Sequence, residues 1–531
     1  MTALIPLLVL TLPLYGIQSV WSTELAFAPP YLLSLGIPRG AMSLILLAAP
    51  LSGLLVQPII GHYADNSTSK YGRRRPYMFV GTVLSAIAML GLGYGKPIFE
   101  GIFGENSALA KGLTIAVAVL SLYVVDFCVN AVMAVDRALL VDVLPANEQD
   151  LANAWAARVV QVASIVGYWI GSIDLPGLLP FLGKTQIQVM SAITVVSLIA
   201  PHALVMIRVK ETPLRPEIDG HEETPSFLEM MKRLWTTIRT LPHVSHMTFH
   251  VQFWSWLSQF SIFIFTTVYI GDIFRSTNPG GDPDAGTRAG SHALFYEGLV
   301  GLATIVTVPP LLQSRRWGIP AIWKSAEPRV ILCATWAASQ LISAIVMFGI
   351  SVSRTVPTAS FFVALNGYCM TVNHWIPFAL VGESILLAAP AAPNEDDEEN
   401  EQGTPLLGQG PPPKKRQLSA GAAMGILNAF ICIPQFIIIG VSSLLFAILE
   451  PHRTIGAHTE PKDLITQAGT EVKDERSITL IFMFRLAAVA GLVAFYLACR
   501  LTRYLGSAET EWSPIRSGPP PTDHTEIDDS P

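Results

Sequence analysis

One segment of the chain places an acid, an amide and a guanidinium at regular spacing within a long apolar run. It reads Asp126-Phe-Cys-Val-Asn130-Ala-Val-Met-Ala-Val-Asp-Arg137. The steps of four and seven residues put Asp126, Asn130 and Arg137 on one stripe of an α-helix, because eleven residues make about three turns and span about 16 Å. Ionised groups facing lipid cost about 2.5–3.5 kcal/mol each. The stripe is therefore expected to face an interior cavity.

The expected chemistry of this stripe is reversible proton transfer. Burial favours the neutral form of a carboxyl group, whereas a nearby cation favours its charged form. Asp126 could therefore exchange a proton, and a mobile Arg137 could set which form is favoured. A static Asp126–Arg137 bridge is the structural alternative, but a backbone separation of about 16 Å argues against a permanent direct pair. We expect the two residues to couple a proton gradient to the movement of a solute.

Further polar side chains lie inside other apolar runs, where they can bind a polar solute. The ring of Trp21 offers a face for a sugar, although aromatic side chains also anchor helices at membrane interfaces. Glu297 is a third ionisable candidate for proton coupling, whereas the lone His374 is interpreted as structural. The candidates for solute binding are Gln18, Trp21, Glu24, Asn130, Asn373 and Gln435.

The composition explains why these groups should lie within a membrane. Of 531 residues, 51% are apolar and only 14% are charged, against about 25% charged in soluble domains. Twelve stretches are long enough to cross a bilayer core as helices, which excludes most soluble enzyme classes. They begin near Ala3, Ala41, Pro76, Leu113, Ala154, Gln188, Val244, His292, Val330, Ala359, Gly421 and Ile478.

No motif in the sequence indicates an enzyme, a metal site or a bound cofactor. The chain has no Gly-x-x-x-x-Gly-Lys loop, zinc-like cluster or serine elbow, which disfavours ATP-driven pumping and hydrolysis. The net charge of −6 comes largely from hydrophilic segments and gives no indication of nucleic-acid binding. The expected partners are a small-molecule sugar and the lipid bilayer, with protons as the coupling ion.

The basic residues predict the orientation of the chain. With the amino terminus in the cytosol, the connectors on that side and the tail hold twenty Lys and Arg residues, against eleven on the other side. Such an excess is typical of cytoplasmic loops. Both termini are therefore expected in the cytosol.

The longer connectors divide the chain into two halves. We predict an N-terminal six-helix bundle over 1–208, a central cytoplasmic connector over 209–243, a C-terminal six-helix bundle over 244–502 and a cytoplasmic tail over 503–531. An insert at 391–419 is acidic, then rich in Gly and Pro, then basic. Such a composition cannot bury a core, so the insert and the tail are expected to be disordered.

A short motif follows the second apolar stretch. Gly61 and Asp65 precede the cluster Arg73, Arg74 and Arg75, so the carboxylate can pair with the basic residues and form a cytoplasmic gate. Plain positive-inside topology is the alternative explanation of the arginines. The motif resembles the loop signature of the major facilitator superfamily. That resemblance implies an all-α membrane protein with the major facilitator fold, twelve transmembrane helices in two six-helix bundles.

A closer resemblance runs from the first apolar stretch to the eleventh. The segments are similar to the sucrose:proton symporters of the glycoside–pentoside–hexuronide group. The resemblance implies symport of sucrose or maltose, with the acid at Asp126 protonated, the arginine at Arg137 essential and the acid at Glu297 linked to function. The segments are 16–21, 51–61, 72–76, 126–144, 375–380 and 425–435.

Departures from the plant pattern point to a fungal-type member. Arg39 stands where plant members have a histidine tied to sugar affinity, and Ala134-Val135 replaces a Gly-Pro pair. Glu24 and Gly382-Glu383 are more like fungal or animal relatives, which accept other α-glucosides or hexoses. The resemblance therefore leaves the sugar open between sucrose, maltose and related compounds.

The sequence leaves two hypotheses for the function of the protein and two for its location. The first reading is a proton-coupled α-glucoside symporter at the plasma membrane; the second is a non-transporting sugar sensor that signals through its cytoplasmic segments. An intact Asp126 and Arg137 favour transport, because a sensor needs no proton carrier. Leu406-Leu407 follows an acidic run and resembles a dileucine sorting signal, so a vacuolar or lysosomal exporter is the third alternative.

Overall fold

The computed structural model of the protein describes residues 4–65, 67–144, 149–209, 211, 238–239, 241–278, 282–314, 327–388, 420–450 and 476–507. Every regular element in these ranges is an α-helix, which confirms the all-α prediction. Most of the predicted central connector, the whole 391–419 insert including Leu406-Leu407, and the tail from 508 onwards lie outside the described residues.

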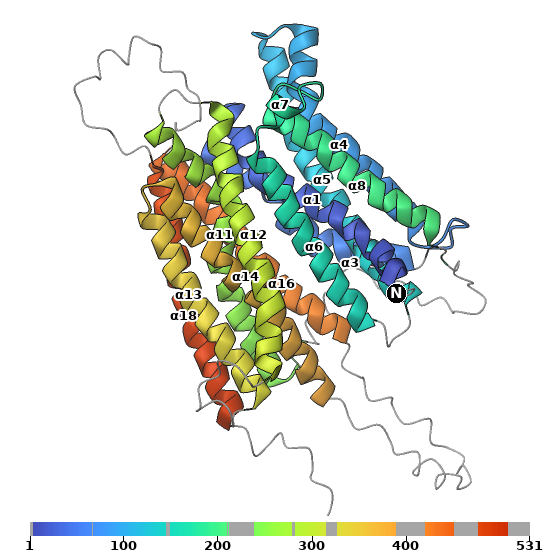
Figure 1. Ribbon diagram of the computed structural model, residues 1–531, viewed down its shortest axis with the longest axis vertical. Helices are drawn as coiled ribbons and strands as arrows, with labels where there is room; N and C mark the ends of the chain where they lie inside the picture. The colour runs from blue at the N-terminus through green and yellow to red at the C-terminus, as the bar shows by residue number, and fades with distance from the viewer. Residues whose placement is uncertain are drawn as a thin grey trace, which may run out of the picture.

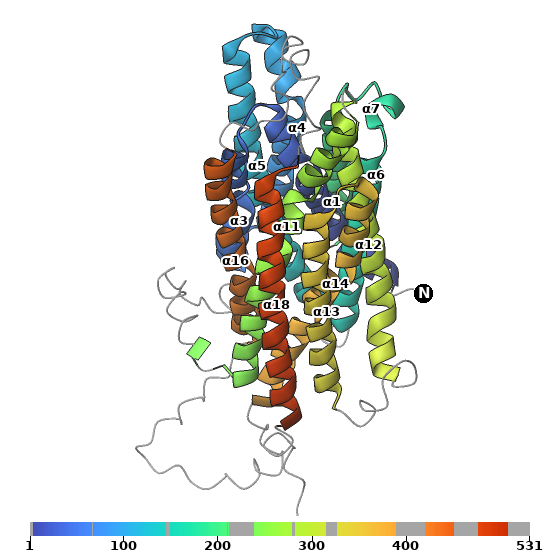
Figure 2. The ribbon, with the colours of Figure 1, turned by 90° about the vertical axis from the view of Figure 1, so that its left-hand side faces the viewer.

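The helices form two groups that lie side by side (Figure 1). After a quarter turn, α18 and α13 lie in front, with α16 to one side (Figure 2). The first group contains α1 (Leu4–Ser34), α2 (Arg39–Ile45), α3 (Ala48–Asp65), α4 (Arg75–Phe103), α5 (Ala108–Val143), α6 (Gln149–Ser172), α7 (Leu175–Leu178) and α8 (Gln186–Arg208). The second contains α11 (His243–Thr277), α12 (Pro283–Ser314), α13 (Pro328–Val352), α14 (Val356–Ala388), α16 (Ala420–Leu449) and α18 (Ile478–Ser507).

Nine segments of the described chain are long and apolar enough to cross a membrane. They comprise α2 and α3 taken together as Arg39–Gly61, and α4, α5, α8, α11, α12, α13, α16 and α18. The helices α1, α6 and α14 coincide with the three other predicted stretches and contain 31, 24 and 33 residues. Spanning by these three helices stays a prediction, as does the total of twelve.

Local signals place the helix ends. The Oγ of Ser107 accepts a hydrogen bond from Ala110 N at the start of α5, and Thr185 forms a capping box with Gln188 at the start of α8. Such side chains satisfy amide groups that have no partner inside the helix. At the other end of the chain, α18 continues to Ser507, so residues 503–507 of the predicted tail are helical. Leu505 is buried there and the Tyr504 ring contacts His243.

The two groups meet at one end of the molecule and diverge toward the other (Figure 1). We define the upper end by the carboxyl termini of α1, α6 and α11 and the lower end by those of α5, α8 and α18. Polar contacts join the groups from the upper end to mid-height: Gln186 N donates to Asp284 Oδ2 at 3.2 Å, Ser291 Oγ to Tyr168 O at 2.9 Å and Gln161 Nε2 to Gly298 O at 3.0 Å.

Gly367 lets α12 and α14 pack backbone to backbone. A Cβ atom at this position would lie 2.1 Å from Glu297 O and 2.8 Å from Gly301 N. A backbone carbonyl cannot move aside as a flexible side chain can, so any larger residue must push the two helices apart. This contact therefore sets the position of Glu297 within the second group.

We expect Gly367→Ala to lower the free energy of unfolding by about 1–3 kcal/mol, as overpacking of a core does. Thermal unfolding of the detergent-purified protein measures the effect. The matched control is Gly440→Ala in α16, where a Cβ would meet nothing within 4 Å and the change should be neutral or stabilising by about 0.5–1 kcal/mol. Equal melting temperatures for the two variants would contradict the close approach.

Candidate functional site

Two buried carboxyl groups meet between the first helix and the fifth. Glu24 of α1 is 4% exposed and Asp126 of α5 is 1% exposed, and their side chains are within hydrogen-bond range of each other. Neither oxygen of Asp126 has another hydrogen-bond partner among the described residues. Like charges in contact away from water do not both ionise. The pair is therefore built to hold a proton.

Asn130 lies one turn from Asp126 and joins α5 to α3. Its Nδ2 donates to Ser52 Oγ at 2.7 Å and to the Asp126 carbonyl at 2.9 Å, while Gln57 Nε2 donates to its Oδ1 at 2.7 Å. A fully paired buried network of this kind fixes side-chain positions. Asn130 therefore fixes the relative position of α3 and α5 beside Asp126, and Gln57 is the less buried member of the network.

Arg137 lies farther along the same stripe of α5, toward the lower end. Its side chain is exposed, although it lies within a predicted span, and it forms no ion pair with a described residue. It interacts electrostatically with His374 of α14, so it faces the second group rather than lipid. The imidazole of His374 is also exposed and packs edge-on against Trp256 at 5.3 Å. His374, interpreted as structural from the sequence, thus lies opposite Arg137.

Glu297 lies at the contact between α6 and α12. It accepts a hydrogen bond from Asn366 Nδ2 at 2.7 Å and interacts electrostatically with Tyr168 of the first group. Both Glu297 and Asn366 are buried. An amide donor supports the charge of Glu297, whereas Asp126 has no such donor. The two carboxyl groups therefore have different surroundings, and Asp126 is the better candidate for proton exchange.

Two candidates for solute binding are engaged by their neighbours. Asn373 is 0% exposed, and its Oδ1 accepts from Ser255 Oγ at 2.7 Å and from Trp336 Nε1 at 3.1 Å. Gln18 Nε2 donates to Ser164 Oγ at 2.7 Å, linking α1 to α6. The Nδ2 of Asn373 has no hydrogen-bond partner among the described residues, so solute binding by this residue stays a prediction.

The remaining binding candidates lie in α1 and α16. Trp21 is half-buried one turn before Glu24, and Gln435 of α16 is 9% exposed. The sequence could not show that Gln57 and His374 join this region, because neither residue type is distinctive inside an apolar run. Among the described residues, no three His, Cys, Asp or Glu side chains are grouped so that they could hold a metal ion.

The arginine cluster at the lower end pairs within the first group. Arg73 and Arg74 both contact the carboxylate of Asp142, at the end of α5. The backbone N of Arg74 donates to Glu211 Oε2 at 2.7 Å, and Arg75 Nε lies 3.9 Å from Glu211 Oε1. Neither acid is predicted from the sequence as a partner of the cluster.

The predicted partner of the cluster, Asp65, has a side chain outside the described residues. A comparable pair, Arg329 Nε to Glu383 Oε1 at 2.7 Å, joins the start of α13 to α14.

Comparisons with known proteins identify the class. The family model of the Major Facilitator Superfamily matches residues 14–389, so the chain belongs to that superfamily. Two solved structures share the fold: a bacterial homolog of the human lysosomal transporter Spinster, in an inward-facing and unoccupied conformation (TM-score 0.56, 13% identity, 94% of this chain and 96% of that chain), and the nucleoside transporter NupG (TM-score 0.54, 12% identity, 94% and 99%). The predicted major facilitator fold is confirmed.

Curated relatives confirm the resemblance to sucrose transporters. A General alpha-glucoside permease of Schizosaccharomyces pombe is 34% identical over 310 residues, 58% of this chain and 56% of its own length. The chain thus matches little more than half of that relative. The Sucrose transport protein SUC4 of Arabidopsis thaliana is 26% identical over 447 residues, 80% of each chain. These relatives are transporters rather than enzymes.

We expect Arg137→Lys to reduce sugar uptake to below about a tenth of the parent rate, because a compact ammonium cannot replace the planar five-donor fork of a guanidinium. Initial rates of labelled-sugar uptake, normalised to protein in the membrane, measure the effect. The control is Arg158→Lys, because Arg158 is exposed and lies over the Trp155 ring, where a lysine also binds. A normal rate for Arg137→Lys would show that a positive charge alone suffices.

Proposed function

We propose that the protein carries sucrose or a related α-glucoside such as maltose together with a proton, by alternating access. The observation that carries this proposal is the buried Glu24–Asp126 carboxyl pair, which has no cation partner among the described residues. The printed names of the relatives support the substrate class.

Protonation of Asp126 removes the negative charge from the centre of the sugar-loaded protein. When Asp126 is protonated, the carboxyl pair can remain buried while the two helix groups move. When Asp126 releases its proton, the new negative charge lies away from water and requires a counter-charge. Arg137, on the same stripe and without an ion pair to a described residue, is the group that can supply it. Release and recapture of one proton thus accompany one transport cycle.

The sugar is expected to bind between the two groups of helices, near the carboxyl pair. Trp21 offers a ring face, while Gln57 and His374 offer hydrogen-bonding groups from opposite sides of the molecule. A sugar that contacts both groups at once can favour their closing around it, because a ligand shifts a conformational equilibrium only through its differential affinity for the two states. The carboxyl pair beside it would couple that closing to protonation.

We place the protein in the plasma membrane with both termini in the cytosol, following the distribution of basic residues. A vacuolar or lysosomal exporter would use the same site with the opposite direction of net flow. A sugar sensor of the same fold would bind sugar without concentrating it. Accumulation of sugar therefore separates the proposed symporter from a sensor.

The variant Asp126→Asn tests the proposal, because asparagine mimics the neutral, protonated side chain at nearly the same size. We expect exchange of labelled sugar across vesicles to continue at a rate within about tenfold of the parent. Accumulation against a gradient should be lost, because it requires proton release inside and return of an empty, charged carrier. Counterflow and active uptake, each with sucrose and maltose, are the two measurements.

The parent protein provides the internal control in these assays. Its accumulation should rise as external pH falls below neutral and should collapse with a protonophore. Uphill accumulation by Asp126→Asn with an unaltered pH dependence would contradict the assignment and leave Glu24 or Glu297 as the proton carrier. Parent uptake that depended on sodium and ignored pH would contradict proton coupling altogether.

A further inference from the structure

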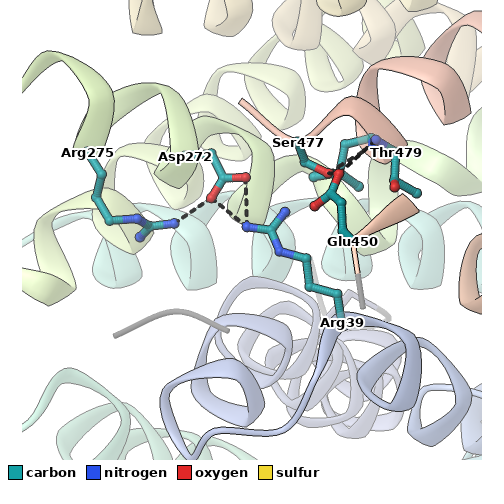
Figure 3. A network of polar contacts seen from close by, with 7 residues as sticks. Arg39, Asp272, Arg275, Glu450, Ser477 and Thr479 are labelled. Atoms are coloured by element: carbon teal, nitrogen blue, oxygen red, sulfur yellow. Dashed lines mark hydrogen bonds and ion pairs between the residues drawn. The ribbon is translucent and has the colours of Figure 1, made fainter. Parts of the chain in front are cut away.

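A buried ion pair crosses between the two groups of helices at the upper end. Arg39 opens α2 in the first group, and its Nη2 lies 2.8 Å from both carboxylate oxygens of Asp272 in α11 of the second group. The two side chains are 2% and 4% exposed. Figure 3 shows the guanidinium reaching from the first group to the carboxylate. This is a charge–charge contact away from water between parts that are 233 residues apart in the chain.

Asp272 has a second charged partner, whereas Arg39 has no second partner among the described residues. Asp272 also accepts from Arg275 Nη2 at 2.8 Å, one turn along the same helix, and Arg275 is partly exposed (Figure 3). Nε and Nη1 of Arg39, in contrast, have no hydrogen-bond partner among the described residues. If the groups separated, Asp272 would keep a cation, whereas Arg39 would lose its ion-pair partner and gain water.

The helices beside this pair pack closely. Gly40, next to Arg39, allows α2 to approach α16 so closely that a Cβ would lie 3.1 Å from Ser443 O. Ser43 is 0% exposed and lies one turn on, on the same side of α2 as Gly40. The ion pair therefore lies beside a buried, close-packed contact between the two groups.

We propose that Arg39 and Asp272 form a latch that holds the upper end of the transporter closed, and that opening of this end consists of the withdrawal of Arg39 from Asp272. Arg275 is the resident counter-charge that keeps Asp272 paired in the open state. The latch goes beyond the proposed function, because it applies to any solute and any coupling ion. In the predicted orientation, the upper end faces away from the cytosol.

Because the ion pair is buried, we expect the latch to be either closed or open rather than to loosen gradually. A buried pair gains its strength from the absence of water but has lost the hydration of both charges. While the contact is dry, removal of one partner from the other is costly. Once water enters, hydration of Arg39 replaces the lost ion pair. The free energy of opening is therefore concentrated in the first separation of α2 from α11 and α16.

A thiol reporter at Ser43 tests the latch. The five native cysteines are replaced by alanine, Ser43→Cys is introduced, and the rate of maleimide labelling is measured on the purified protein in detergent. Both ends of the protein are then accessible, so the result does not depend on orientation in the membrane. We expect Arg39→Met to raise the labelling rate at least about tenfold, because it removes the latch but leaves Asp272 paired with Arg275.

The matched control is Arg275→Gln. It breaks an ion pair of the same 2.8 Å length to the same carboxylate, but this pair lies within α11 and joins nothing across the groups, so labelling should not rise above the parent rate. Loss of the counter-charge that Asp272 keeps in the open state should instead lower it. An equal rise in both variants, or no rise with Arg39→Met, would overturn the latch.

Two further variants guard against a folding defect. Arg39→Lys keeps the charge but loses the fork, so it should raise labelling by less than Arg39→Met does. Adding Asp272→Asn to Arg39→Met should give no further rise, because the contact is already broken. Independent, multiplying effects of the two changes would contradict a shared latch. Failure of the symport proposal would leave all of these labelling rates as expected.

Discussion

A carboxyl group buried among helices must either keep its proton or find a cation, and the middle of this molecule is arranged around that constraint. Asp126 meets a second acid, Glu24, instead of an arginine. The buried ion pair between Arg39 and Asp272, in contrast, brings opposite charges together. In the proposed mechanism the site of Glu24 and Asp126 holds a proton, and Asp126 is the group that exchanges it.

In the proposed mechanism, protonation at Asp126 is coupled to a movement of the two groups of helices relative to each other. They are joined from the upper end to mid-height by Arg39–Asp272 and by the contacts between α6 and α12. At the lower end, Arg73 and Arg74 tie the turn between α3 and α4 to Asp142 within the first group. Arg329 and Glu383 make a comparable contact within the second group, so these ion pairs stabilise each group internally and leave movement between the groups free in the proposed mechanism.

The features that could be predicted from the sequence are those that depend on short stretches of chain. The apolar runs predicted helices because the thickness of a bilayer fixes their length, and the spacing of Asp126, Asn130 and Arg137 predicted one stripe because helix geometry is regular. The end of α18 was missed by five residues, because the burial of Leu505 against other helices is not visible in a hydropathy pattern.

Features that depend on helix–helix packing could not be predicted. Glu24 was recognised as polar and buried, but its contact with Asp126 requires knowing which faces of α1 and α5 meet. In the same way, Asn373 was expected to bind solute, whereas its amide oxygen is taken up by Ser255 and Trp336. Arg39 stood out from the sequence only as a departure from the plant pattern, with no indication of Asp272 as its partner.

The central claim is that sugar and proton move together through one site, and proton movement driven by sugar tests it most directly. The purified protein is reconstituted in weakly buffered vesicles that start with equal pH on both sides and no membrane potential. Sucrose or maltose is added outside, with mannitol as the control, while internal pH is recorded. The account predicts that the interior acidifies as the sugar enters and stays constant with mannitol. Sugar entry at an unchanged internal pH would contradict it.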